Sequence, residues 1–144
     1  MHSKVINPTC VCGSFRKTAR ITTQIYDKFL KPAGLKVTQY SMLSAIRRCG
    51  VVSINDLAVE TLLERTTCTR NLKLLEKKSL IRVHSGDDKR MKMVALTEHG
   101  VERLVAATPL WEQAQSFIVA EVGEEEVAPL VEGVQRLMDT LQKI

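Results

Sequence analysis

The sequence has few aromatic residues, no long apolar run and no motif for a catalytic site. Phe, Tyr and Trp together make up 4% of its 144 residues. No stretch approaches the roughly 20 consecutive apolar residues that cross a bilayer, and the first 15 residues lack the apolar segment of a signal peptide. Glycine-rich phosphate loops and metalloprotease motifs are absent from the sequence as well. We therefore expect a cytoplasmic protein with no membrane partner.

Cysteine and histidine are sparse and scattered along the chain. Of the four cysteines, only Cys10 and Cys12 lie close together, and the spacing of the four matches no zinc site. A disulfide scaffold is not expected in a cytoplasmic chain. A thiol hydrolase would need a histidine and an orienting acid near its cysteine, and no histidine is so placed. The sequence therefore predicts a protein that is not an enzyme and binds no cofactor.

Charge divides the chain into a basic part and an acidic part. The formal net charge is +5, and residues 1–61 carry nine Lys and Arg against three Asp and Glu. Residues 62–96 carry nine against four, whereas residues 97–144 carry three against nine. This pattern favours a polyanionic partner for the first two-thirds of the chain.

Hydrophobic periodicity predicts a mainly α-helical protein with one short β-hairpin. Apolar positions at helical spacing indicate helices over residues 12–31, 39–48, 54–61, 64–78, 98–121 and from 124 onward. Thr38, Ser53 and Thr97 are suited to cap the starts of three of these helices. Alternating residues over 81–84 and 91–96 indicate two antiparallel strands joined by a polar loop. The short helix, turn, longer helix and two-stranded wing are typical of a winged helix-turn-helix.

The helix over residues 64–78 has two chemically different sides. Cys68, Leu72 and Leu75 recur at i, i+4 and i+7, which predicts a narrow apolar side packed on the domain. The opposite side carries short hydroxyls followed by cations: Thr66, Thr69, Arg70, Lys73 and Lys77. Such a helix fits the major groove, where Arg70 can donate a fork of hydrogen bonds to guanine, a contact worth roughly 1–3 kcal/mol. Asn71 would pair with an adenine edge if its side chain turned inward.

The predicted hairpin has Asp88-Lys89-Arg90 at its tip. Lys89 and Arg90 would lie where a minor groove passes, and a narrow minor groove attracts an inserted arginine. We expect Asp88 to hold the neighbouring arginine rather than to contact DNA.

At these positions the sequence resembles the MarR family of bacterial regulators. The resemblance covers about residues 12–142, and its motifs are Arg65 to Leu72, Leu75 to Ile81, Asp88-Lys89-Arg90 and Leu96-Thr97-Glu98-His99-Gly100. The Asp-x-Arg wing followed by Leu-Thr-x-x-Gly is a specific signature. Two positions depart from the family pattern, because Ser79 stands where glycine is common and Cys68 where an aliphatic residue is usual.

The resemblance implies one domain over residues 1–144 with two functional regions. Residues 38–96 would form the DNA-binding winged helix-turn-helix, and residues 10–37 and 97–144 a helical dimerisation region. The homodimer would bind double-stranded DNA at a pseudo-palindromic operator, with one recognition helix in each half-site, and we expect it to act as a repressor. With the two wing cations included, the residues expected to contact DNA are Arg65, Thr66, Thr67, Thr69, Arg70, Asn71, Lys73, Lys89 and Arg90.

Cys10 and Cys12 lie at the predicted start of the first helix, where the helix dipole lowers the pKa of a thiol. In the hydroperoxide-sensing branch of the family, Cys12 corresponds to the reactive cysteine and Tyr26 to one of two supporting tyrosines, while Val37 replaces the other. Three hypotheses stay open. Cys12 is oxidised and pairs with Cys10 or with another chain, or the two thiols hold a soft metal with His2 or a residue of another chain. Otherwise both thiols are inert, and a small apolar or aromatic inducer binds between the DNA-binding region and the dimerisation helices.

A winged helix can also serve as an RNA-binding or protein-docking module that binds no operator. Proteins that read single-stranded RNA usually display aromatic residues for base stacking, and the predicted recognition helix has none. The sequence therefore favours a transcription regulator that binds duplex DNA.

Overall fold

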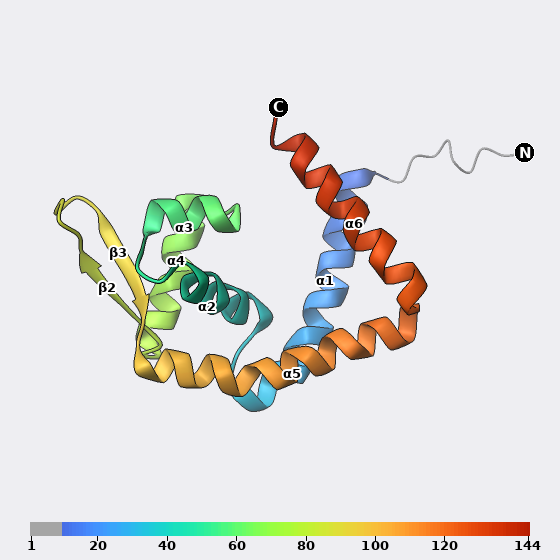
Figure 1. Ribbon diagram of the computed structural model, residues 1–144, viewed down its shortest axis with the longest axis horizontal. Helices are drawn as coiled ribbons and strands as arrows, with labels where there is room; N and C mark the ends of the chain where they lie inside the picture. The colour runs from blue at the N-terminus through green and yellow to red at the C-terminus, as the bar shows by residue number, and fades with distance from the viewer. Residues whose placement is uncertain (1–9) are drawn as a thin grey trace, which may run out of the picture.

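The computed structural model describes residues 10–144, most of which lie in helices (Figure 1). The elements in chain order are α1 (Val11–Leu30), the 3-10 helix η1 (Lys31–Ala33), α2 (Val37–Cys49), β1 (Val52–Ser53), α3 (Ile54–Thr61), α4 (Arg65–Lys77), β2 (Ile81–Ser85), β3 (Lys92–Leu96), α5 (Glu98–Val122) and α6 (Glu124–Leu141). This order confirms the predicted mainly α fold with a small antiparallel wing. Of the helices between residues 10 and 144, none combines the length and apolar character needed to cross a bilayer.

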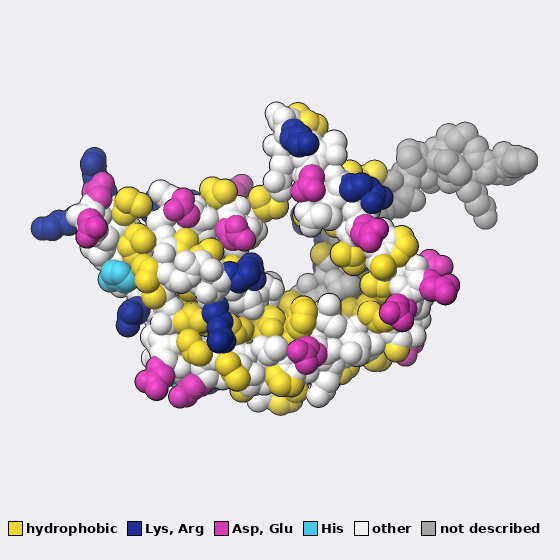
Figure 2. Space-filling model, in the orientation of Figure 1, with side chains coloured by type: hydrophobic (Ala, Val, Ile, Leu, Met, Phe, Trp, Pro, Cys, Tyr) yellow, Lys and Arg dark blue, Asp and Glu magenta, His cyan; other side chains and the backbone are white. Residues whose placement is uncertain are grey.

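Helix α5 connects the two parts of the molecule. In Figure 1 it runs along the lower edge, with α2, α3, α4 and the hairpin at its N-terminal end and α6 at its C-terminal end. Helix α1 packs against α5, and α2 contacts both of them. Figure 2 shows that the molecule is open between α6 and the group formed by α2, α3, α4 and the hairpin, here called the lobe.

The sheet has a third strand that the sequence does not predict. The strand order is β1-β3-β2, and both pairs are antiparallel. Ser53 of β1 lies opposite Met93 of β3, and Val83 of β2 lies opposite Val94 of β3. Two residues are too few to display a period of two, so β1 leaves no periodic signal. Its pairing brings the start of α3 beside the base of the wing.

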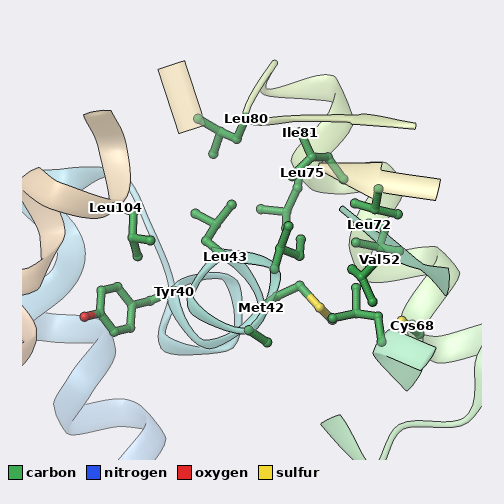
Figure 3. Packing of buried hydrophobic residues seen from close by; sticks show 14 of the residues in the cluster. Tyr40, Met42, Leu43, Val52, Cys68, Leu72, Leu75, Leu80, Ile81 and Leu104 are labelled. Carbon is green, nitrogen blue, oxygen red and sulfur yellow. The ribbon is translucent and has the colours of Figure 1, made fainter. Parts of the chain in front are cut away.

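The core of the lobe lies between α2, α4 and the sheet (Figure 3). Cys68, Leu72 and Leu75 of α4 are at most 2% exposed, which confirms the predicted apolar side of that helix. Each leucine so buried contributes roughly 1.5–3 kcal/mol to folding. Cys68 packs here as a small apolar residue, which explains why it can replace an aliphatic side chain. The core therefore fixes which side of α4 remains outside.

Two of the three predicted helix caps are present. Ser53 Oγ accepts from the backbone N–H of Asp56 at 3.0 Å, and Thr97 Oγ1 accepts from that of Gly100 at 3.0 Å. The prediction for Thr38 is wrong, because α2 already begins at Val37. The N–H of Val37 donates instead to Asp27 Oδ1 of α1 at 2.8 Å. A cap supplied by another helix leaves no local sequence pattern.

The turn after α4 contains Ser79 in the left-handed region, with φ 60°. An L-residue with a side chain is disfavoured there, which gives a physical reason for the glycine that the family resemblance implies at this position. The carbonyl of Ser79 accepts from Thr97 Oγ1 at 2.6 Å. A Cβ atom at Gly100 would overlap the carbonyl oxygen of Leu80, so glycine is required where α5 packs beside this turn.

Replacing Ser79 by glycine should stabilise the protein. Ser79→Gly relieves the left-handed strain, and we expect a gain of about 1 kcal/mol in the free energy of unfolding. Urea denaturation at a fixed protein concentration measures it. Ser41→Gly is the matched control, because Ser41 is exposed inside α2 and glycine there should cost about 0.5 kcal/mol. A loss of stability in both variants would contradict this reading of the turn.

Candidate nucleic-acid interface

The side of α4 that faces away from the core is polar, basic and accessible. Figure 3 shows Cys68, Leu72 and Leu75 directed into the core. The residues expected to contact DNA lie outside that core: Arg65, Thr66, Arg70 and Lys73 are exposed, and Thr67, Thr69 and Asn71 are half-buried. Lys77 is exposed as well. None of these positions is therefore fully buried, and the four exposed residues together with Lys77 form an accessible basic surface.

Arg65 begins α4 and is held by a residue of α3. Its Nη1 donates to Asn55 Oδ1 at 2.7 Å, across the turn between the two helices. A guanidinium has five N–H donors, so this bond orients Arg65 while leaving other donors available. Asn55 is a residue of the candidate interface that the sequence does not predict. Its hydrogen bond to Arg65 spans the turn between α3 and α4, so it leaves no periodic signal in the sequence.

The wing tip carries an oriented arginine. Asp88 Oδ1 accepts from the backbone N–H of Arg90 at 3.0 Å and lies 3.4 Å from Arg90 Nε, so Asp88 holds Arg90 as expected. The side chain of Arg90 is nonetheless 92% exposed. An ion pair this exposed adds little to the free energy of unfolding. Its main effect is to orient the side chain of Arg90. Figure 2 shows Lys and Arg side chains projecting from the hairpin tip.

A small hollow lies between the hairpin and the N-terminal ends of α3 and α4. It is lined by Ser53, Ile54, Asn55, Arg65, Arg90, Met91 and Lys92. Three cations thus face the N-terminus of α3, where unpaired backbone N–H groups and the positive end of the dipole favour an anion. Lys92 and the start of α3 are not predicted as contact sites, because only the pairing of β1 with β3 places them beside Arg65.

A second hollow, of about 330 Å³, lies between α2 and α5. Its lining residues are Tyr40, Ser44, Arg47, Arg48, Leu104 and Thr108. The Tyr40 hydroxyl lies 3.2 Å from Thr108 Oγ1, and the Tyr40 ring stacks on Trp111 with centroids 5.9 Å apart. Figure 3 shows the hydroxyl of Tyr40 directed away from the core. The hollow therefore combines aromatic surface, hydroxyls and two cations.

The two N-terminal cysteines lie at the start of α1. Cys10 is its N-cap, and Cys10 Sγ accepts from the N–H of Gly13 at 3.4 Å. Cys10 and Cys12 are both exposed. Among residues 10–144, no three metal-binding side chains lie together, and His2 lies outside the described residues.

Tyr26 does not approach Cys12 within one chain. The two residues are 14 positions apart on the continuous helix α1, which at 1.5 Å per residue separates them by about 21 Å. Burial raises the pKa of the Tyr26 phenol above its usual value. If Tyr26 contacts Cys12, the tyrosine must therefore belong to a second chain.

Cys68 should react far more slowly than Cys49 with a thiol reagent. Cys68 is fully buried and Cys49 is exposed. Burial also raises the pKa of the Cys68 thiol, and the opposing effect of Arg65 is smaller, so less thiolate is present at pH 8. In a protein carrying Cys10→Ser and Cys12→Ser, we expect one rapid equivalent of thiol in the folded state. The second should appear only in denaturant, and two rapid equivalents would contradict the buried position of Cys68.

Comparison with known proteins identifies the family. The model of the MarR family matches residues 33–91. The HTH-type transcriptional regulator SarZ of Staphylococcus epidermidis is 32% identical over 130 residues, which span 89% of this chain and 86% of SarZ.

Two solved structures agree with this assignment. The M. tuberculosis transcriptional regulator MosR in complex with DNA is 36% identical, with a TM-score of 0.75 over 90% of this chain and 98% of that chain. A second crystal structure of MosR is 32% identical, with a TM-score of 0.81 over 95% of this chain and 98% of that chain. These relatives are regulators rather than enzymes, which confirms that prediction. This chain belongs to the MarR family and is a DNA-binding transcription regulator with a winged-helix fold.

Proposed function

We propose that the protein acts as a homodimer that binds a pseudo-palindromic operator and represses transcription. The observation that carries this proposal is the accessible side of α4. Thr66 and the cations along the helix are exposed, while the opposite side closes the core of the lobe. The crystal structure of MosR with DNA supports the same use of the fold here.

Exposed apolar stripes on α1 and α6 support a dimer. In the single chain, α6 has no buried residue, and Leu130, Val131 and Leu141 are each more than half exposed. Val11 and Ile21 of α1 are exposed to a similar degree. Contiguous apolar surface of this kind usually marks an interface. We therefore assign residues 10–37 and 97–144 to dimerisation and residues 38–96 to DNA binding.

The DNA contacts follow from the chemistry of each side chain. Arg70 would read guanine in the major groove, and Asn71 an adjacent base edge, while the threonines and Lys73 position the helix on phosphates. Arg65, held by Asn55, would contact the backbone at the start of α4. Arg90 would enter the minor groove, with Lys89 beside it.

Modulation by oxidation is compatible with the position of Cys10 and Cys12. A hydroperoxide would oxidise the Cys12 thiol to a sulfenic acid and leave as its alcohol; the Cys10 thiol would then form the disulfide and release water. Because Cys10 Sγ also caps α1 through Gly13, this step would remove the cap. The hollow between α2 and α5 supports the other hypothesis, in which a small apolar or aromatic inducer would contact Tyr40 and Leu104 there.

Loss of the Arg70 side chain should reduce specificity more than general affinity. With a duplex selected from a random pool, we expect Arg70→Ala to weaken binding by roughly 1–3 kcal/mol, because one forked contact to guanine is lost. Random DNA should be bound almost as before, as measured by fluorescence anisotropy. Lys28→Ala, which removes one exposed charge from α1, is the control and should change neither.

If Arg70→Ala weakened binding to the selected duplex and to random DNA equally, Arg70 would be a phosphate contact rather than a base contact. Tight binding of single-stranded RNA in preference to any duplex would favour the alternative, an RNA-binding module without an operator.

Substitution of Cys12 should separate the two modes of modulation. If oxidation is the signal, organic hydroperoxide releases the wild-type protein from its duplex, and Cys12→Ser abolishes this release because no sulfenic acid forms. Cys49→Ser, which also removes an exposed thiol, should still respond. Release of the Cys12→Ser protein by peroxide would exclude Cys12 as the sensor. A gel-shift titration with and without oxidant measures all three proteins.

A further inference from the structure

Three helices meet at the connector between α1 and α2, residues 31–36. From α1, Asp27 Oδ1 accepts from the N–H of Val37 at 2.8 Å, just beyond the connector. From α5, Arg103 Nη1 donates to the carbonyl oxygen of Ala33 at 3.2 Å. Asp27, Val37 and Arg103 are all half-buried, so these bonds are partly shielded from water. The connector is thus held by both helices against which it packs.

The third helix is α4 itself, which reaches the connector through its C-cap. Lys78 Nζ donates to the carbonyl oxygen of Gly34 at 3.2 Å and to Gln39 Oε1 at 3.3 Å. Gln39 Oε1 also accepts from the N–H of Lys36 at 3.0 Å. The connector and the start of α2 are therefore bonded to α1 through Val37, and to the recognition helix through Gly34 and Gln39.

This link matters because α4 packs chiefly against α3 and β2, inside its own lobe. Its position relative to α5 is also set at the turn after α4, where Thr97 Oγ1 donates to the carbonyl oxygen of Ser79, whereas its position relative to α1 is set through α2 and the connector. Charge supports the arrangement: Asp27 is the one carboxylate in a surface hollow of about 380 Å³ whose cations are Lys31, Lys36 and Lys78. Its single negative charge partly offsets the three positive charges around the connector.

We propose that Asp27 and Lys78 are positioning residues that set the placement of α4 relative to α1 and α5. The inference rests on the proposed dimeric binding to an operator. If α1 and α6 hold the two chains together, the placement of α4 relative to α1 and α5 determines the distance between the two recognition helices. B-form DNA fixes that distance at about 34 Å, one helical turn. Asp27 and Lys78 thereby select half-site spacing without contacting a base.

The test measures affinity for duplexes whose two half-sites are separated by different numbers of base pairs. The wild type should show one sharp optimum. Asp27→Ala should weaken binding at that optimum by about tenfold, comparable to the loss of one good base contact, and should flatten the dependence on spacing. Asp27→Asn should restore the optimum, because the amide oxygen still accepts from Val37. Glu60→Gln, which removes an exposed carboxylate elsewhere in the lobe, should match the wild type.

Lys78→Met is the second variant to be measured on the same duplexes. It tests the proposal independently if Asp27→Ala folds poorly. A lysine that merely contacts phosphate would, when replaced, weaken all duplexes equally and lower the slope of affinity against salt by about one. A positioning lysine leaves that slope unchanged and loses the spacing optimum. An unaltered optimum in both Asp27→Ala and Lys78→Met, or a loss that is equal at all spacings, would overturn the proposal. A wild type without any spacing preference would instead contradict dimeric operator binding itself.

Discussion

Burial of Cys68, Leu72 and Leu75 holds α4 in the lobe with its hydroxyls and cations directed outward. The other side of the helix is polar enough to remain in water, so this narrow apolar contact, together with the bonds of Arg65 and Lys78, fixes the rotation of α4 about its own axis. The remaining contributors to the interface depend on that rotation. Arg65 meets Asn55 across the turn, and the wing stands beside the start of α4, only when the apolar side faces the core.

Charged residues and exposed apolar residues are distributed differently along the chain. Most basic residues lie in residues 1–96, whereas α5 and α6 carry most of the acidic residues. Helices α1 and α6 keep apolar surface that the single chain does not cover, and the long helix α5 joins this surface to the wing. If α1 receives a signal, as proposed above, the connector between α1 and α2 is one path by which it would reach the lobe.

The parts of the fold that follow a local period are visible in the sequence. The two sides of α4, the hairpin and the caps at Ser53 and Thr97 all depend on residues within a few positions of one another. Features that depend on residues far apart in the sequence are not visible in it. Examples are the pairing of strand β1 with β3, the capping of α2 by Asp27 in place of Thr38, and the position of Lys92 beside Arg65. The separation of Cys12 from Tyr26 shows the same limit, because correspondence with a family position cannot say which chain supplies a partner.

Selection of duplexes from a random pool by the wild-type protein shows whether two copies of the chain bind DNA together. We expect enrichment of an inverted repeat whose half-site centres lie about one turn of B-form DNA apart, bound by two chains per duplex in sedimentation measurements. Enrichment of a single unrepeated motif bound by one chain, or no enrichment over random DNA, would contradict it.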